Sequence, residues 1–179
     1  MGFLDALLGR RKVKGPAPDR LFAITTAYVD LESQQGIKTR GKAAIVFQPL
    51  ATSDFQSIVT DMEEVLKGTG DEIGSSVETS DDEFGYRWMI VQDPDLEDLA
   101  VGGYNERVLC AVFAFEDQAK QPIYFIYNYK RGAWYPFVPA RGGKQRNSER
   151  ELQIKAQVGQ GLPIEAELER WFPLWGIPI

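Results

Sequence analysis

Side chains able to do chemistry are few in this 179-residue chain, and histidine is absent. This absence excludes Ser-His-Asp and Cys-His triads, a histidine general base and histidine-ligated zinc. The single cysteine, Cys110, lies inside an apolar run, where a thiol is typically buried and inert. Catalysis would therefore depend on carboxylates, lysine, arginine or tyrosine.

The candidate catalytic set is Glu149 and Glu151 together with Tyr129, Lys130 and Arg131. Nothing in their spacing brings these residues together, and acidic residues at a helix start typically cap the helix in solvent. We therefore predict no catalytic residues, no metal site and no cofactor, and a protein that is not an enzyme.

Two short motifs resemble ion or phosphate sites only superficially. The acidic run 81–83 lacks the alternating ligands and central glycine of a calcium loop. Residues 142–144, Gly-Gly-Lys, lack the earlier glycine and the following serine or threonine of a phosphate-binding loop. We interpret both as turns in solvent, although the basic loop around 140–147 could meet an acidic partner.

The elements that must position any site belong to one domain of ordinary globular composition. A single cysteine fits a reducing compartment, and no apolar run approaches the roughly 20 residues of a membrane span. The first residues do not form a secretory signal. The net charge of −6 argues against nucleic acid as a partner. These features predict a cytoplasmic protein.

Residues 1–18, MGFLDALLGRRKVKGPAP, form a predicted segment separate from a domain over 19–179. Its apolar residues share one helical face, and a basic cluster follows them. This pattern favours an anchor on an anionic membrane, where each cation contributes about 1 kcal/mol. A helix that docks on a partner and a frayed terminus remain alternatives. The contact residues would be Phe3, Leu4, Leu7, Leu8, Arg10, Arg11, Lys12 and Lys14.

The stretch 107–139 holds the densest run of β-branched and aromatic residues. It predicts three strands, at 108–115, 123–129 and 133–138, joined by short turns into an antiparallel meander. The first strand is apolar almost without a break, which indicates cover on both faces. Pro136 lacks a backbone donor, so the third strand is expected at a sheet edge.

The remaining patterns complete an α+β fold with a single, mainly antiparallel sheet and helices packed on it. Further strands are expected at 25–31, 41–48, 77–80 and 84–92. Helices are expected at 19–24, 52–67 and 148–158, with a last helix near Pro163. Ser148 and Glu151 are interpreted as a capping box for the helix at 148–158.

Two aromatic groups are candidate binding surfaces. In the C-terminal sequence LERWFPLWGIPI, the aromatic residues either pack across the domain or form a partner patch of Trp171, Phe172 and Trp175. A concave sheet face could instead bind a small molecule or a peptide, and its residues would be Tyr127, Tyr129, Trp134 and Tyr135.

Several stretches resemble the PspAB family of PspA-associated proteins, found mainly in actinobacteria and haloarchaea. The matching residues are MGFLDALLGR, FGYRW at 84–88, LCAVFAF at 109–115, YNYKRGAWYPFVP at 127–139 and LPIEAELERWFPLWGIPI at the end. The segment between Leu99 and Val108 is shorter than the family pattern, which has a longer helical stretch there.

This resemblance implies a role in the phage-shock response to membrane stress, with PspA or another stress-response protein as partner. It implies no catalytic residues. Together with the amphipathic N-terminal pattern, it favours a non-catalytic adaptor at the inner face of the cell membrane. A small-molecule or peptide-binding domain is the alternative, and the oligomeric state is left open.

Overall fold

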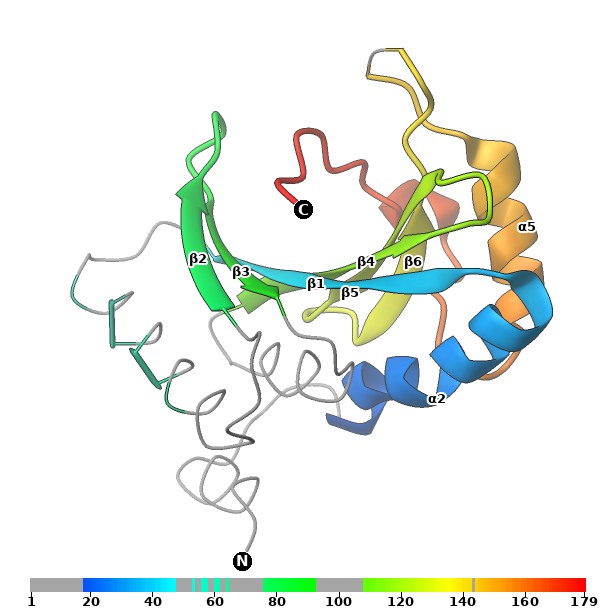
Figure 1. Cartoon of the computed structure of the whole chain (residues 1–179), viewed down its shortest axis with the longest axis horizontal. Helices are drawn as coiled ribbons and strands as arrows, with labels where there is room; N and C mark the ends of the chain where they lie inside the picture. The colour runs from blue at the N-terminus through cyan, green and yellow to red at the C-terminus, as the bar shows by residue number, and fades with distance from the viewer. Residues whose placement is uncertain are drawn as a thin grey trace, which may run out of the picture.

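The computed structural model describes residues 18–47, 53, 56, 57, 60, 61, 64, 76–92, 108–142 and 144–179. Six strands form one antiparallel sheet in the order β2-β3-β1-β4-β5-β6, with helices α2 and α5 beside it (Figure 1). The elements are α2 (Pro18–Gln35), β1 (Lys38–Phe47), β2 (Ser76–Asp81), β3 (Arg87–Gln92), β4 (Val108–Glu116), β5 (Pro122–Asn128), β6 (Ala133–Phe137), α5 (Ser148–Val158) and the 3₁₀ turn η1 (Leu168–Arg170). The predicted fold class is confirmed.

The predicted meander is confirmed as β4, β5 and β6. β6 is an edge strand, with β5 on one side and no strand on the other. Pro136 pairs with Phe125 of β5, and its missing N–H is tolerated because no further strand needs a donor from it. Gly132 has φ 61° in the turn between β5 and β6, a conformation that residues with a Cβ rarely adopt. β1 lies at the centre, where Ala44 faces Ile90 of β3 and Val112 of β4.

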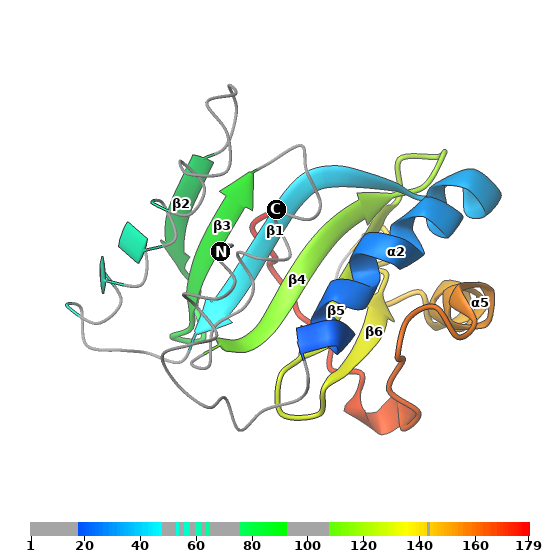
Figure 2. The same cartoon turned by 90° about the horizontal axis from the view of Figure 1, so that it is seen from below.

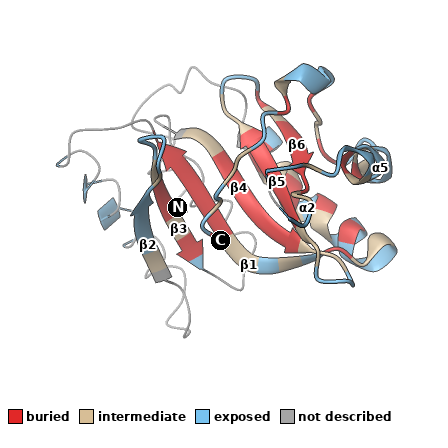
Figure 3. Cartoon of the chain, turned by 90° about the horizontal axis from the view of Figure 1, so that it is seen from above, coloured by how far each residue is buried: buried red, intermediate tan, exposed pale blue. Residues whose placement is uncertain are grey.

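Two apolar clusters lie on opposite faces of the sheet, which explains why β4 is apolar almost throughout. Ala111 and Phe113 belong to the cluster beneath α2 and α5, whereas Val112 and Ala114 belong to the cluster beneath the C-terminal residues. Figure 2 shows α2 crossing one face, and Figure 3 shows the chain end crossing the other over buried strands. Both faces are therefore core over the central part of the sheet, whereas β2 is largely exposed.

The prediction for residues 19–31 is corrected. Thr25 to Leu31 form no strand, because α2 runs unbroken from Pro18 to Gln35. Leu21, Ile24 and Leu31 are buried on the sheet at helical spacing. Tertiary packing therefore favours a helix here, although the alternation of residues predicted a strand. The helix ends where Ile37 N–H donates to the Leu31 carbonyl (3.0 Å) and Gly36 adopts φ 64°.

Of the two helices predicted near the C-terminus, at 148–158 and near Pro163, only the first is confirmed at full length. α5 is confirmed, but Asn147 is its cap, since the Asn147 side chain accepts from the Arg150 N–H (3.0 Å). Glu151 is not part of a capping box. The last helix is reduced to η1. Of the helix expected at 52–67, the described residues are helical and exposed: Ser53, Gln56, Ser57, Thr60, Asp61 and Glu64.

The strand expected at 84–92 begins only at Arg87, because the residues before it form the hairpin turn from β2. The Asp82 carboxylate accepts from the N–H groups of Phe84 and Tyr86 (2.9 Å each) and from the Trp88 indole (2.8 Å). Partial burial raises the pKa of Asp82, but these hydrogen bonds outweigh burial and leave it lowered. Asp82 and Glu83 thus lie in a turn, as predicted, whereas Asp81 is the last residue of β2.

Candidate interaction surface

The residues that follow α5 are fixed to the open edge of the sheet. Trp134 in β6 donates its N–H to the Pro163 carbonyl (2.8 Å), and Glu165 N–H donates to the Trp134 carbonyl (2.7 Å). Ile164 thereby forms a parallel bridge with Trp134. The Trp134 indole also donates to the Arg20 carbonyl (2.6 Å), which joins this edge to the start of α2.

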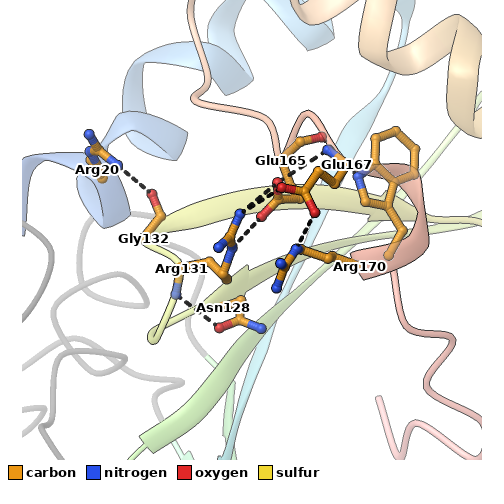
Figure 4. A network of polar contacts seen from close by, with 8 residues as sticks. Arg20, Asn128, Arg131, Gly132, Glu165, Glu167 and Arg170 are labelled. Carbon is orange, nitrogen blue, oxygen red and sulfur yellow. Dashed lines mark hydrogen bonds and ion pairs between the residues drawn. The ribbon is translucent and has the colours of Figure 1, made fainter.

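An Arg–Glu pair holds the same segment from the β5–β6 turn (Figure 4). Glu165 is 6% exposed, and its carboxylate lies 2.9 Å from Arg131 Nε. The hydrogen bond from the Arg131 guanidinium lowers the pKa of Glu165, with a further contribution from the N–H of Glu167. Arg131 Nη2 also lies 3.6 Å from the Glu167 carboxylate, and Arg170 contacts Glu167 from η1. Glu165 is therefore held ionised where the segment leaves the sheet edge.

A second Arg–Glu pair lies between the loop 139–147 and α5. Glu151 is 2% exposed, accepts from the Val138 N–H (2.9 Å) and lies 3.0 Å from Arg146 Nε. Burial raises the pKa of Glu151, opposed by the bonds from Val138 and Arg146. Arg146 also donates through Nη1 to the Trp171 carbonyl. This buried pair therefore connects α5 to the C-terminal segment.

A pocket of about 110 Å³ opens between the first turns of α5 and η1. Leu152 on α5 is 45% exposed and Leu168 on η1 is 47% exposed, so both present apolar surface to solvent. The residues that line it are Arg146, Ser148, Glu151, Leu152, Leu168 and Trp171. We call it the α5–η1 pocket. Three of its lining residues are polar or charged and three are apolar.

The predicted partner patch is divided by the structure. Trp171 is buried, stacks on Tyr135 and donates its indole N–H to the Glu165 carbonyl (3.0 Å). Trp175 is half-buried against Phe137. Of the three patch residues only Phe172 is well exposed, at 57%. Most of the aromatic tail thus packs across the domain.

The expected ligand face is corrected. Tyr127 and Trp134 are buried in the cluster beneath α2, and Tyr129 packs against Tyr127 at the rim of that cluster. Tyr135 is buried on the opposite face, because neighbouring residues of a strand point to opposite sides of the sheet. These four aromatic residues therefore do not form one open face.

The candidate catalytic set is not brought together either. Glu151 pairs with Arg146 and Arg131 with Glu165, while Glu149 and Lys130 are exposed. Cys110 is partly buried, and burial raises the pKa of its thiol to about 12, which keeps it protonated. Within the described ranges, no group of three His, Cys, Asp or Glu residues is placed to hold a metal ion.

The predicted N-terminal contact residues, between Phe3 and Lys14, lie outside the described residues. Sequence reasoning missed Arg146 and Glu165 as the residues that fix the C-terminal segment. For Arg146, the sequence indicated only that the basic loop around 140–147 could meet an acidic partner. For Glu165, no local pattern distinguishes it from Glu167 or Glu169. In the part of the chain that the structure describes, no helix is both long and apolar enough to cross a membrane.

The fold and this surface define an α+β protein whose single antiparallel sheet is covered by helices on one face and by its C-terminal segment on the other. The family model for PspAB, PspA associated protein B, matches residues 1–179, and the chain belongs to this family. Membership associates it with PspA and the phage-shock system. No curated protein and no solved structure gave a significant match.

Proposed function

We propose that this PspAB protein is a non-catalytic adaptor of the phage-shock response that contacts both PspA and the cytoplasmic face of the membrane. The observation that carries the proposal is the family match over the whole chain. Residues 2–14 would bind anionic lipid, and the folded domain would bind PspA. The protein would thereby link the state of the membrane to its partner.

The α5–η1 pocket supports the partner half of the proposal. Its volume of about 110 Å³ is well below the roughly 300–1,000 Å³ of sites that enclose a metabolite. It suits a single apolar side chain, because it is somewhat smaller than a cavity of roughly 150 Å³ that accommodates benzene. Leu152 and Leu168 are exposed at its rim and rest on fixed elements. This shape favours an anchor residue of a protein partner over a small-molecule ligand.

Purified PspA from the same organism tests the partner contact by calorimetry. We expect Leu168→Glu to weaken binding at least about tenfold, since a carboxylate at the rim would be desolvated by the partner. Val29→Glu is the matched control, because Val29 is a similarly exposed apolar residue (53%) on α2. Equal affinity of the two variants would contradict docking at this pocket.

Flotation with liposomes tests the membrane contact. The full chain is compared with a variant in which Arg10, Arg11, Lys12 and Lys14 are all replaced by glutamine. At about 1 kcal/mol per cation, binding to anionic vesicles should fall roughly a thousandfold. Binding of the full chain should also weaken with salt and be absent on neutral vesicles. Salt-insensitive binding, or none, would refute the membrane half of the proposal.

A further inference from the structure

The last eight residues, 172–179, lie over the second face of the sheet and are called here the C-terminal strap. We propose that the face beneath the strap is a binding site for an extended apolar segment, and that a second copy of this chain supplies its own strap to it. Two copies would then exchange straps. Such self-association is distinct from the adaptor function.

The strap is held by side chains and not by a backbone ladder. Tyr135 Oη donates to the Phe172 carbonyl (2.9 Å), and Tyr124 Oη donates to a main-chain oxygen of Ile179 (2.9 Å). Among the described residues, no backbone–backbone hydrogen bond joins 172–179 to a strand, and the turn at 175 and 176 lies within the strap. The strap can therefore leave the face without breaking any β-ladder, unlike every strand of the sheet.

The bonds from the face to the strap recognise main-chain oxygens, and one ring contact adds selectivity. Trp175 meets Phe137 edge to face, with ring centroids 5.3 Å apart. Tyr135 contacts a carbonyl that any extended segment offers, whereas Tyr124 contacts the last residue and the ring contact requires an aromatic residue at one position. The face thus has the features of a peptide site with one anchor.

Exposure along the strap resembles that of a bound ligand more than that of an integral strand. Ile179 is 8% exposed, but no residue from Phe172 to Pro178 is buried. Trp171, immediately before the strap, is fixed independently by its indole bond to Glu165 and by Arg146. The chain can therefore pivot between Trp171 and Pro173 while the residues before it keep their places.

A second copy is the occupant that these contacts favour. Its residues 172–179 offer the same main-chain oxygens and the same tryptophan to Tyr135, Tyr124 and Phe137. Exchange would conserve each of these contacts. The equilibrium between the closed monomer and the exchanged dimer would therefore depend on the backbone between Trp171 and Pro173 and on protein concentration. Peptide capture and light scattering together distinguish a second copy from another protein with a similar aromatic segment.

The test uses the full chain and a fluorescently labelled peptide of residues 172–179. The chain's own strap competes with the peptide, so the apparent dissociation constant is the intrinsic one divided by the open fraction. Trp175→Ala in the chain weakens the internal strap and should tighten peptide capture at least about tenfold. The same substitution in the peptide should abolish capture. Leu174→Ala, which removes a strap side chain packed on the face and leaves the face itself intact, gives an independent variant if Trp175→Ala does not fold.

Light scattering of the unmodified chain at rising concentration completes the test. We expect a dimer whose population falls when the peptide is added in excess. Peptide capture without any dimer would refute a second copy as occupant and indicate a segment of another protein. No capture by either variant would refute the face as a binding site. Neither result depends on PspA or on lipid, so failure here is distinct from failure of the adaptor function.

Discussion

Replacing Arg146 by methionine tests how the buried Arg–Glu pair holds the C-terminal segment. Arg146 Nε lies 3.0 Å from the Glu151 carboxylate, and Nη1 donates to the Trp171 carbonyl. Methionine keeps an unbranched apolar stem beside Phe137, where the guanidinium lies 5.5 Å from the ring centre. The substitution therefore removes the charge and its contacts with Glu151, Trp171 and the Phe137 ring, while preserving most of the packing.

The cost follows from the charge that remains. Breaking a buried ion pair typically costs about 3–5 kcal/mol, because the other ion stays buried without compensation. Glu151 can avoid part of this cost by binding a proton. Protonation at pH 7 costs about 3 kcal/mol, since pH 7 lies about 2.5 pH units above the ordinary value of 4.5. The lost bond to Trp171 adds about 1 kcal/mol. We expect a loss of about 4 kcal/mol at pH 7.

The sign of the pH dependence follows from the same carboxylate. Burial already raises the pKa of Glu151, and removal of Arg146 takes away groups that lower it. Above pH 4.5 the folded variant then binds more protons than the unfolded chain, so its stability falls as pH rises. Near pH 5 protonation costs under about 1 kcal/mol, and the total loss should shrink to under about 2 kcal/mol.

Urea unfolding followed by tryptophan fluorescence at about pH 5 and pH 7 measures both losses. The double variant Arg146→Met/Glu151→Gln should recover most of the loss at pH 7 and show little pH dependence. Arg141→Met is the matched control from the same loop, because Arg141 is exposed, and should change stability by under about 0.5 kcal/mol. Equal losses at both pH values, or no recovery in the double variant, would refute the reasoning.

Two further substitutions test the contacts at the sheet edge. The hydrogen bond from Arg131 lowers the pKa of Glu165, so its contribution is present above the ordinary value of 4.5 and is lost as pH falls below it. Glu165→Gln should therefore flatten the loss of thermal stability below pH 4.5, whereas the exposed Glu169→Gln should not; identical curves would contradict this role. Trp134→Phe leaves the Arg20 carbonyl without its indole donor, and this loss should cost about 1–2 kcal/mol in addition to the cavity left in the core, with faster hydrogen exchange at the start of α2. Unchanged exchange there would show that the indole bond does not hold α2.

Short-range patterns determined most of the sheet. The run from Val108 to Phe115 predicted a strand covered on both faces, and two apolar clusters enclose it. Gly132 and Pro136 predicted a tight turn and an edge strand because one permits positive φ and the other lacks a donor. These properties belong to single residues or to the period of a strand, so they can be read without the fold.

Residues 25–31 show where local patterns fail. Their alternation and β-branched content favour a strand, yet the segment is helical, and Leu21, Ile24 and Leu31 of this helix are buried on the sheet. The aromatic face failed for a related reason. Trp134 and Tyr135 were grouped by composition, but adjacent residues of β6 must lie on opposite faces.

The sequence by itself therefore determined the fold class, the meander, helix α5 and the family to which the chain belongs. Only the tertiary structure decided which carboxylates pair, Glu165 with Arg131 and Glu151 with Arg146. It also decided the course of the C-terminal strap. Partners 34 residues apart, as Arg131 and Glu165 are, leave no periodic trace, and a segment without a ladder has no pattern that fixes its path. Their positions follow from the packing of the whole domain.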